Sequence, residues 1–166
     1  MTAIAHYPAR HYLRLRLALG QLHNISPDWI VPSNGASELL TGAVRELVNL
    51  KLTYLIVPGF WDYWRALQGF GAKVKSCPFS WKRKTFFLNL DPVNPQLSGV
   101  IINNPHNPTG KLFHRDILLP LLEKFALVVV YKSFMDFFPP HEQQSLIPMM
   151  GDYPNLVIIR LLTKFG

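Results

Sequence analysis

Three short segments hold side chains that could do chemistry, and each directly follows an apolar run. They are SNGASELL at residues 33–40, NNPHNPTGK at residues 103–111 and RLLTKFG at residues 160–166. Open α/β sheets bind their ligands where buried parallel strands end. The three segments therefore stand where such a fold would place its chemistry.

The first segment is suited to an anion. The free N–H groups at the start of a helix, together with the helix dipole, attract negative charge. Gly35, Ala36 and Ser37 are small enough to let a phosphate approach these groups. The structural alternative is that Ser37 only caps the helix, and the sequence leaves both open.

Asn107 and Lys164 are the other two side chains with clear chemical potential. Two Asn-Pro steps favour extended backbone and can hold a cis peptide, so they make the loop rigid enough to aim Asn107. A lysine at a strand end in apolar company loses part of its proton affinity and becomes an amine nucleophile. The alternatives are a simple turn for residues 103–111 and a solvated surface charge for Lys164.

The elements that must position these side chains follow from the hydrophobic pattern. Apolar β-rich runs predict strands at residues 53–57, 72–77, 99–103, 126–131 and 156–160, with a shorter one at 29–32. Amphipathic segments predict helices around residues 9–23, 36–49, 60–70 and 114–125. This alternation predicts an α/β fold with a mostly parallel sheet and helices on both faces.

Composition predicts one cytoplasmic domain. The chain has 166 residues, of which 49% are hydrophobic and 16% charged, enough apolar material for a single core. The N-terminal segment lacks the apolar centre and cleavage site of a signal peptide, and no run is long enough to cross a membrane. Cys77 is the single cysteine, which excludes an internal disulfide and fits a reducing compartment.

The net charge of +7 raises a nucleic-acid hypothesis. Residues 80–87, SWKRKTFF, mix cations with aromatic side chains, as single-strand binders do. A charged turn or edge strand explains the same pattern, and no recognised nucleic-acid motif accompanies it. We therefore rank nucleic-acid binding last and expect no such partner.

Five segments taken together resemble one family. NGASELL, PGFWDYWRAL, NNPHNPTG, VVVYKSFMDF and RLLTKF occur in the order typical of class I and II pyridoxal-phosphate aminotransferases. The sequence is most similar to the branch of histidinol-phosphate aminotransferase and threonine-phosphate decarboxylase, from about Tyr7 to the last residue. The resemblance implies pyridoxal 5'-phosphate as cofactor, a small amino-acid substrate, and transamination or decarboxylation in amino-acid metabolism. It also implies a homodimer.

The resemblance also implies roles for individual residues. Lys164 corresponds to the lysine that forms a Schiff base with the cofactor and later moves the substrate's Cα proton. The turn at residues 35–37 and the hydroxyl of Thr163 correspond to groups that contact the cofactor phosphate. Asn107 corresponds to the amide that contacts the 3-oxygen of the cofactor ring, and Phe60 corresponds to the aromatic side chain stacked on that ring. Phe134 stands at a position that has a hydroxyl in many members. Tyr7 corresponds to a tyrosine that contacts the phosphate of the neighbouring subunit.

The sequence departs from the family where the cofactor ring would lie. Tyr131 stands in place of the aspartate that keeps the pyridine nitrogen protonated, and this ring is the electron sink of the reaction. Lys132 replaces the acid that usually follows, placing a cation where an anion is needed. Leu161 stands in place of a phosphate-binding Ser or Thr. These changes favour the alternative hypothesis of a decayed, non-catalytic remnant or one half of a split enzyme.

The extent of the resemblance predicts an incomplete domain. Residues 1–166 correspond to an incomplete cofactor-binding large domain, without the family's N-terminal arm and its C-terminal small domain. Roughly half of a full-length member is represented. In the family, the predicted strand at residues 29–32 pairs with a strand that follows the lysine, so we expect this segment to lack its neighbour.

Overall fold

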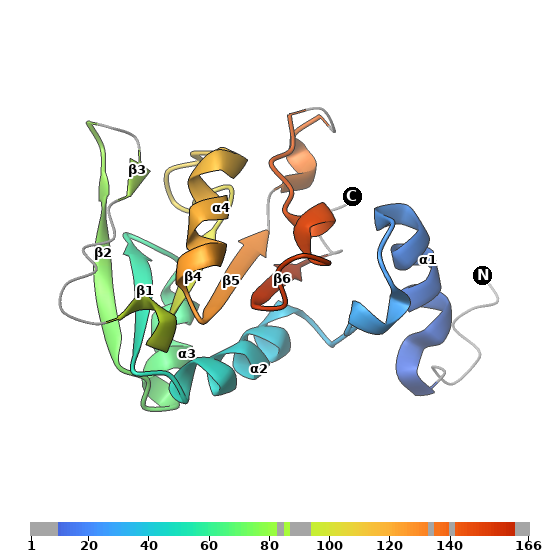
Figure 1. Cartoon of the computed structure of the whole chain (residues 1–166), viewed down its shortest axis with the longest axis horizontal. Coiled ribbons are helices and arrows are strands. Elements are labelled where there is room, and N and C mark those ends of the chain that lie inside the picture. The colour runs from blue at the N-terminus through green and yellow to red at the C-terminus, as the bar shows by residue number, and fades with distance from the viewer. Residues whose placement is uncertain (1–9, 83–84, 87–93, 133–134, 140–141, 162–166) are drawn as a thin grey trace.

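A six-stranded, mostly parallel sheet forms the centre of the computed structural model (Figure 1). The structure describes residues 10–82, 85–86, 94–132, 135–139 and 142–161. The strand order is β3-β2-β1-β4-β5-β6, and every neighbouring pair is parallel except β2 and β3. The strands are β1 (Leu52–Val57), β2 (Val74–Ser80), β3 (Thr85–Phe86), β4 (Ser98–Asn103), β5 (Leu127–Lys132) and β6 (Leu156–Arg160). The five longer strands confirm the prediction from the apolar runs.

Helices cover both faces of the sheet, as the alternating pattern predicted. Helices α2 and α3 pack on one face and α4 packs on the other (Figure 1). Helix α1, drawn in blue, lies beyond β6 at the end of the sheet (Figure 1). The helices are α1 (Leu13–His23), α2 (Ala36–Val48), α3 (Trp61–Gly69) and α4 (Arg115–Lys124). None of these helices is long and apolar enough to cross a bilayer.

The core divides into two clusters, one on each face of the sheet. Val100 and Val128 point toward α4, whereas their neighbours Ile101 and Val129 point toward α2 and α3. Successive side chains of a strand face opposite sides of the sheet, so a strand buried on both faces needs an uninterrupted apolar run. This is why residues 100–102 in β4 and 128–130 in β5 are apolar without interruption.

The strand predicted at residues 29–32 does not form. Trp29 ends a short 3₁₀ turn, Pro27–Trp29, and Ile30 follows in an extended conformation with φ −106° and ψ 122°. Within the described residues this stretch has no strand beside it, and β6 is the edge of the sheet. Extended apolar backbone becomes a strand only when a neighbour completes its hydrogen bonds, so the apolar pattern alone was insufficient.

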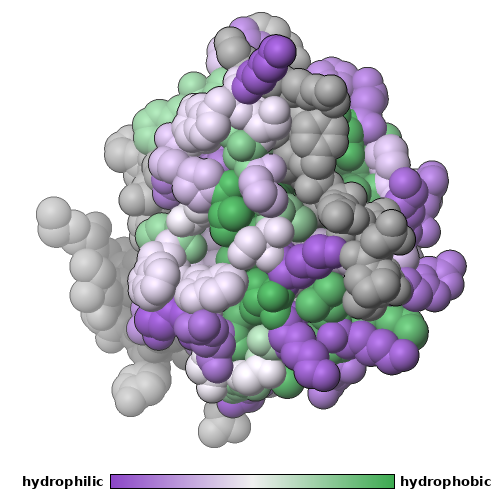
Figure 2. All heavy atoms as spheres, turned by 90° about the vertical axis from the view of Figure 1, so that its left-hand side faces the viewer, coloured by the Kyte–Doolittle hydropathy of each residue, from purple (hydrophilic) through white to green (hydrophobic). Residues whose placement is uncertain are grey.

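The basic aromatic segment is part of a hairpin at the other edge of the sheet. β2 pairs antiparallel with the two-residue strand β3, and the turn between them contains Lys82. Trp81 is exposed and packs edge-on against Phe79, with ring centroids 5.2 Å apart. Figure 2, which faces this side of the molecule, shows hydrophilic and hydrophobic side chains intermingled. For the described residues of this segment the interpretation as a turn and edge strand is confirmed, and Arg83, Lys84 and Phe87 lie outside them.

Two glycines, Gly99 in the α2–β4 contact and Gly42 on the exposed side of α2, test this packing. A Cβ at Gly99 would lie 2.2 Å from Cδ2 of the buried Leu47, whereas a Cβ at Gly42 would meet nothing within 4 Å. We expect Gly99→Ala to lower the free energy of unfolding by about 1–3 kcal/mol, because the helix must move away from the strand. Gly42→Ala should raise it by about 0.5–1 kcal/mol through helix propensity. Urea denaturation measures both, and equal stabilities for the two variants would contradict the packing.

Candidate active site at the carboxyl edge of the sheet

The parallel strands bring several loops to one edge. β1, β4, β5 and β6 run in the same direction, so their carboxyl ends lie along the same side of the sheet. Helix α2 runs against them, because Leu47 near its end contacts Gly99 near the start of β4. The turn before α2 is therefore directed toward the edge where the loops after β1 and β4 begin.

Helix α2 begins without a side-chain cap. Gly35 is its N-cap residue, and its φ of +88° is one that residues with a side chain rarely adopt. In the part of the chain that the structure describes, no side-chain hydrogen bond caps this helix, and Ser37 is exposed, so the alternative in which Ser37 only caps the helix is wrong. The N–H groups of the first turn thus keep the capacity to bind an anion.

Two hydrogen bonds shape the turn that leads into α2. The hydroxyl of Ser33 donates to the carbonyl oxygen of Gly35 at 2.8 Å, and the carboxylate of Glu38 accepts from the N–H of Asn34 at 2.9 Å. A Cβ at Gly35 would meet no atom within 4 Å, so the outer side of the turn is open. Internal hydrogen bonds therefore hold the turn, and its outer side is accessible to a ligand.

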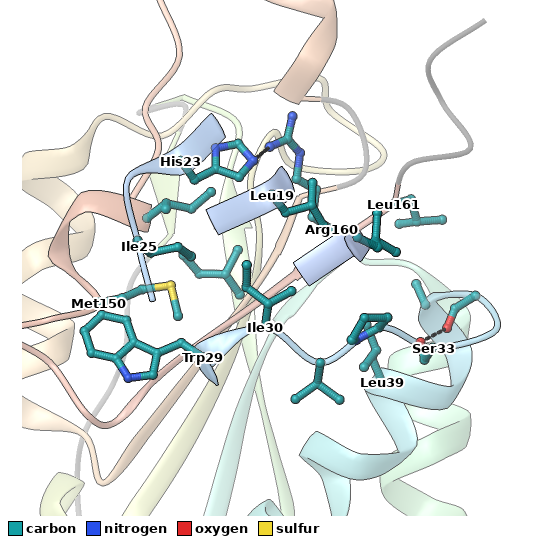
Figure 3. Close-up of a pocket in the computed structure, with 17 residues that line it drawn as sticks. Leu19, His23, Ile25, Trp29, Ile30, Ser33, Leu39, Met150, Arg160 and Leu161 are labelled. Carbon is teal, nitrogen blue, oxygen red and sulfur yellow. Dashed lines mark hydrogen bonds between the residues drawn. The ribbon is translucent and has the colours of Figure 1, made fainter. Parts of the chain in front are cut away.

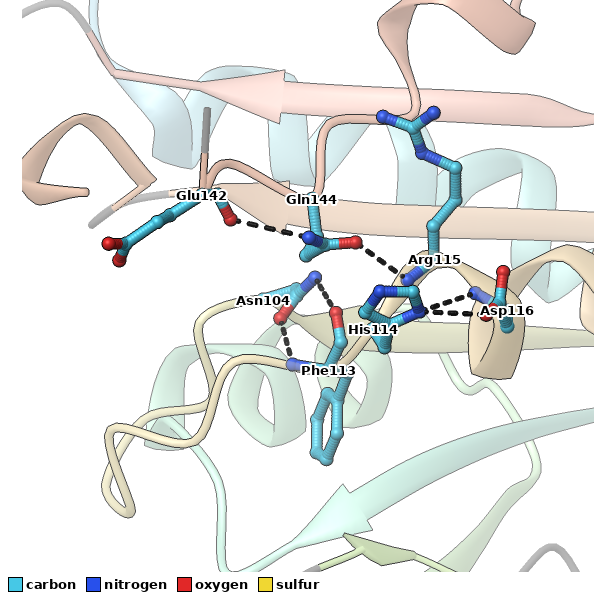
Figure 4. A network of polar contacts seen from close by, with 7 residues as sticks. All are labelled: Asn104, Phe113, His114, Arg115, Asp116, Glu142 and Gln144. Carbon is cyan, nitrogen blue, oxygen red and sulfur yellow. Dashed lines mark hydrogen bonds and ion pairs between the residues drawn. The ribbon is translucent and has the colours of Figure 1, made fainter. Parts of the chain in front are cut away.

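The loop after β4 is fixed at both ends. The side chain of Asn104 donates to the carbonyl oxygen of Phe113 at 3.1 Å and accepts from its N–H at 2.8 Å (Figure 4). The peptide bonds preceding Pro105 and Pro108 are both cis, as the two Asn-Pro steps allowed. The half-buried Asn107 lies between these bonds.

His106 anchors the same loop to the core. Its ring stacks on Phe79 with centroids 5.2 Å apart and planes within 12°, and its Nδ1 lies 2.8 Å from the hydroxyl oxygen of Thr109. Burial lowers the pKa of His106, and the backbone carbonyl of Pro58 opposes this shift in part. Burial therefore favours the neutral form of His106, and its ring packs the β4 loop against β2.

An aromatic cluster occupies the carboxyl ends of β4 and β5. The ring of Tyr63 contacts Tyr131 edge-on at 5.2 Å and Phe60 edge-on at 5.6 Å, measured between centroids. The side chain of Asn103 donates to the Tyr63 hydroxyl at 2.5 Å. Burial raises the pKa of Tyr63 well above its ordinary value, and this hydrogen bond opposes the shift in part. The cluster is therefore neutral and holds Tyr131 in place.

Tyr131 and Lys132 point to opposite faces of the sheet. Tyr131 packs with the cluster on the α2 and α3 side, where Ala36 also lies. Lys132 is only 2% exposed, and its Nζ donates to the hydroxyl of Ser145 at 2.9 Å. The expectation that Lys132 sets a cation beside the position of the missing acid is wrong, because consecutive strand residues face opposite sides.

Residues 142–145, which include the hydrogen-bond partner of Lys132, are held to the start of α4. Gln144 accepts a hydrogen bond from the N–H of Arg115 at 3.1 Å and donates to the carbonyl of Glu142 at 3.3 Å (Figure 4). Because Ser145 follows Gln144 directly, these bonds hold the hydroxyl that Lys132 contacts. Lys132 thus belongs to the structural framework of the opposite face.

A cleft of about 250 Å³ opens between α1, residues 29–33, the start of α2 and β6 (Figure 3). Its lining is mostly apolar and includes Leu161, so the position predicted to have lost a phosphate contact lies against a hydrophobic wall. At one side of the cleft, Nη1 of Arg160 donates to Nε2 of His23 at 2.5 Å. Gly35 and Ala36 also line the cleft, so it adjoins the turn before α2.

The structure thus brings part of the predicted site together. Ala36 and Tyr131 share one buried cluster, and Phe60 reaches Tyr131 through Tyr63. Gly35, Ser37 and Asn107 lie on the turn and loop described above, whereas four predicted residues fall outside the described part of the chain: Tyr7, Phe134, Thr163 and Lys164.

Sequence reasoning missed Tyr63 and Asn103. An asparagine at the last position of a buried strand is a signal that could have identified Asn103, since buried amides need partners.

His106 supports a prediction about pH. Because burial lowers its pKa below the ordinary 6.5, the unfolded chain binds more protons than the folded chain as the pH falls below 6.5. Stability should therefore be fully present above pH 6.5 and decline below it, with His106 contributing up to about 1.4 kcal/mol per pH unit. Urea denaturation at several pH values measures this slope.

His106→Gln should remove this part of the slope. Thr109→Ala, which loses the hydrogen bond but keeps the imidazole, should retain it. An unchanged slope in His106→Gln would show that this imidazole is not the group that titrates.

Comparison with known proteins agrees with this architecture. The family model for aminotransferase class I and II matches residues 1–165. Threonine-phosphate decarboxylase of Salmonella typhimurium is 28% identical over 173 residues, covering 99% of this chain and 46% of that protein. Histidinol-phosphate aminotransferase 1 of Pasteurella multocida is 31% identical over 147 residues, covering 84% of this chain and 40% of that protein.

Solved structures show the same fold. Histidinol-phosphate aminotransferase from Sinorhizobium meliloti, in complex with pyridoxal-5'-phosphate, has a TM-score of 0.81 at 22% identity, covering 96% of this chain and 44% of that one. The L-threonine-O-3-phosphate decarboxylase of Porphyromonas gingivalis has a TM-score of 0.80 at 20% identity, with coverages of 96% and 49%. The chain spans about half the length of the relatives it matches. Over that span, its sequence places it in the aminotransferase class I and II family.

Proposed function

We propose that this chain is the cofactor-binding half of a pyridoxal-phosphate-dependent aminotransferase or decarboxylase that acts on a small amino acid. The observation that carries the proposal is the uncapped start of α2, which lies with Asn107 and the aromatic cluster at the carboxyl edge of the sheet. The family assignment supports it, as does the similarity to enzymes named for phosphorylated substrates.

The residues present fit the phosphate and one face of the ring. The open turn at Gly35 offers N–H groups to an anion, and Gly35 leaves space for it to approach. Phe60 is 41% exposed and is held by Tyr63, so it can supply an aromatic face. The amide of Asn107 can donate to a ring oxygen.

Tyr131, the residue that would face the pyridine nitrogen, fits the cofactor less well. Tyr131 is a neutral phenol, which can donate a hydrogen bond to an unprotonated pyridine nitrogen but cannot hold a proton on it. The chain is therefore suited to bind the cofactor more than to use its ring as an electron sink. This favours the second candidate function: a non-catalytic remnant, or one half of a split enzyme.

In this proposal the chain's own groups have separate tasks. Bound cofactor supplies an aldehyde that reacts with amines and a ring that withdraws electrons. The start of α2 orients the phosphate, and Asn107 orients the ring. The buried cluster around Tyr131 excludes water from the side of the cofactor site where the pyridine nitrogen would lie. Lys164 supplies the amine that attaches the cofactor and afterwards holds or moves a proton at Nζ.

The quaternary and cellular context is part of the proposal. Family resemblance supports a homodimer in which Tyr7 reaches the phosphate of the neighbouring subunit, and a cytoplasmic location. The net charge of +7 and the exposed turn after β2 are the support for nucleic-acid binding, and we do not propose that function.

Cofactor binding can be tested directly on the purified chain. Titration with pyridoxal phosphate should produce an absorbance band, and borohydride should fix the cofactor onto Lys164, because the family resemblance assigns the Schiff base to this lysine. Peptide mass mapping locates the modified lysine. Lys164→Ala should lose the band, while Lys111→Ala, which removes an exposed lysine from the β4 loop, should keep it. Equal labelling of Lys111 and Lys164 would contradict a specific site.

The role of Tyr131 calls for a separate substitution. Tyr131→Asp restores a carboxylate at the ring position, yet we expect less than a tenfold gain in turnover of phosphothreonine or histidinol phosphate. The reason is that the chain spans only about half of its catalytic relatives.

Tyr131→Phe, which preserves the aromatic packing, is the matched control, and circular dichroism should show that both variants fold. Turnover restored in Tyr131→Asp to the level of a complete enzyme would rule out the remnant hypothesis.

A further inference from the structure

Asn34 and Gly35 form the only asparagine–glycine step in the sequence. Such a step has a chemistry of its own, because the backbone nitrogen of the second residue can attack the carbonyl carbon of the asparagine side chain. A side chain on the second residue hinders this approach, and glycine has none. In a folded chain, the reaction depends on whether the side-chain amide of Asn34 and the N–H of Gly35 are accessible.

Both of these groups are accessible in the turn before α2. Asn34 and Gly35 are exposed, and a Cβ at Gly35 would meet no atom within 4 Å. Among the described residues, no hydrogen bond engages the side-chain amide of Asn34 or the N–H of Gly35. The two hydrogen bonds of the turn use other atoms: the N–H of Asn34, and the carbonyl oxygen of Gly35, which accepts from Ser33 (Figure 3).

The other described asparagines lack an available nucleophile. Asn94, Asn104 and Asn107 precede proline, which has no N–H. Elsewhere the next N–H already donates to a backbone carbonyl oxygen at 2.9 to 3.1 Å, as it does after Asn24, Asn49, Asn103 and Asn155. Such a bond must break before the nitrogen can attack. Asn34 is therefore the one asparagine in the described part of the chain that is followed by an unpaired N–H.

We propose that Asn34 is a site of spontaneous deamidation that places a carboxylate at the start of α2. The nitrogen of Gly35 loses its proton to base and bonds to Cγ of Asn34. The bond from Cγ to Nδ2 breaks, and ammonia leaves. Water then opens the cyclic imide at either of its C–N bonds, which gives aspartate or isoaspartate. One water is consumed for each ammonia released, and nothing is oxidised or reduced.

The new carboxylate would lie beside the groups that are suited to bind an anion. Gly35 is the N-cap residue of α2, and no side chain caps the first turn. Negative charge at residue 34 offsets the attraction of these N–H groups for a phosphate. Isoaspartate also lengthens the backbone of the turn, which disturbs the hydrogen bond from the N–H of Asn34 to Glu38. This consequence for phosphate binding rests on the proposed function, whereas the deamidation itself does not.

Peptide mass mapping of the full chain follows the reaction. In mildly alkaline buffer without phosphate, Asn34 should convert roughly tenfold or more faster than Asn24, because Ile25 hinders the attack and its N–H is hydrogen-bonded. Isoaspartate should be among the products, since the cyclic imide yields it and direct hydrolysis of the amide does not. Equal conversion of Asn24 and Asn34, or aspartate alone at residue 34, would overturn the proposal.

Ile25→Gly separates the effect of the fold from that of the glycine. This variant gives Asn24 a glycine neighbour, while the N–H of residue 25 can still donate to the carbonyl oxygen of Gly20, as it does at 3.0 Å in the native chain. Asn24 should still convert several-fold more slowly than Asn34 in the folded variant, which circular dichroism checks. Equal rates at the two positions would show that the unpaired N–H of Gly35 is not what selects Asn34.

Two substitutions of Asn34 measure the consequence for phosphate. Asn34→Gln keeps the amide on a longer side chain that cyclises poorly, so residue 34 should stay unconverted. Asn34→Asp carries the carboxylate permanently and should bind pyridoxal phosphate about threefold to tenfold more weakly than Asn34→Gln, measured by the absorbance band. Equal affinity would overturn the effect on the anion site. Conversion of Asn34 without cofactor binding by the wild type or either variant would support the deamidation site and show that the proposed cofactor site is wrong.

Discussion

Parallel pairing of strands that are buried on both faces is the constraint on which the other features depend. Each of these strands must be apolar throughout, and each must be followed by a connection that returns over a face of the sheet. The polar residues of the connections are therefore collected along the carboxyl edge. The turn at Gly35, the loop with Asn107 and the cluster around Tyr131 are directed to this edge for this reason.

The carboxyl edge is organised for rigidity more than for charge. Paired hydrogen bonds between Asn104 and Phe113 hold the β4 loop, and the stacked ring of His106 fastens it to the core. Tyr131 is packed against Tyr63, and the phenol of Tyr63 stays protonated because burial disfavours its anion. Among the described residues, the carboxyl end of β5 holds the phenol of Tyr131 where the resemblance to the family predicts an aspartate.

The two edge strands of the sheet have different surroundings. At one end the short strand β3 closes the sheet with a hairpin and an exposed, charged turn, which is a common protection for an edge. At the other end, β6 faces an apolar cleft into which both core clusters extend. Among the described residues no strand covers this apolar edge, which is unusual for a natural sheet.

From the sequence alone, the five long strands, the four helices and the family could be predicted, because strand and helix periodicities are local and the motifs occur in order. The positions of Gly35 and Asn107 at strand and helix ends followed from the same patterns. Tertiary structure decided that Lys132 points away from Tyr131, toward Ser145, and that residues 29–32 form no strand. It also revealed the contacts of Tyr63 and Asn103. The physical reason is that these outcomes depend on which face a side chain occupies and whether a neighbouring strand is present, and both are set by contacts between distant parts of the chain.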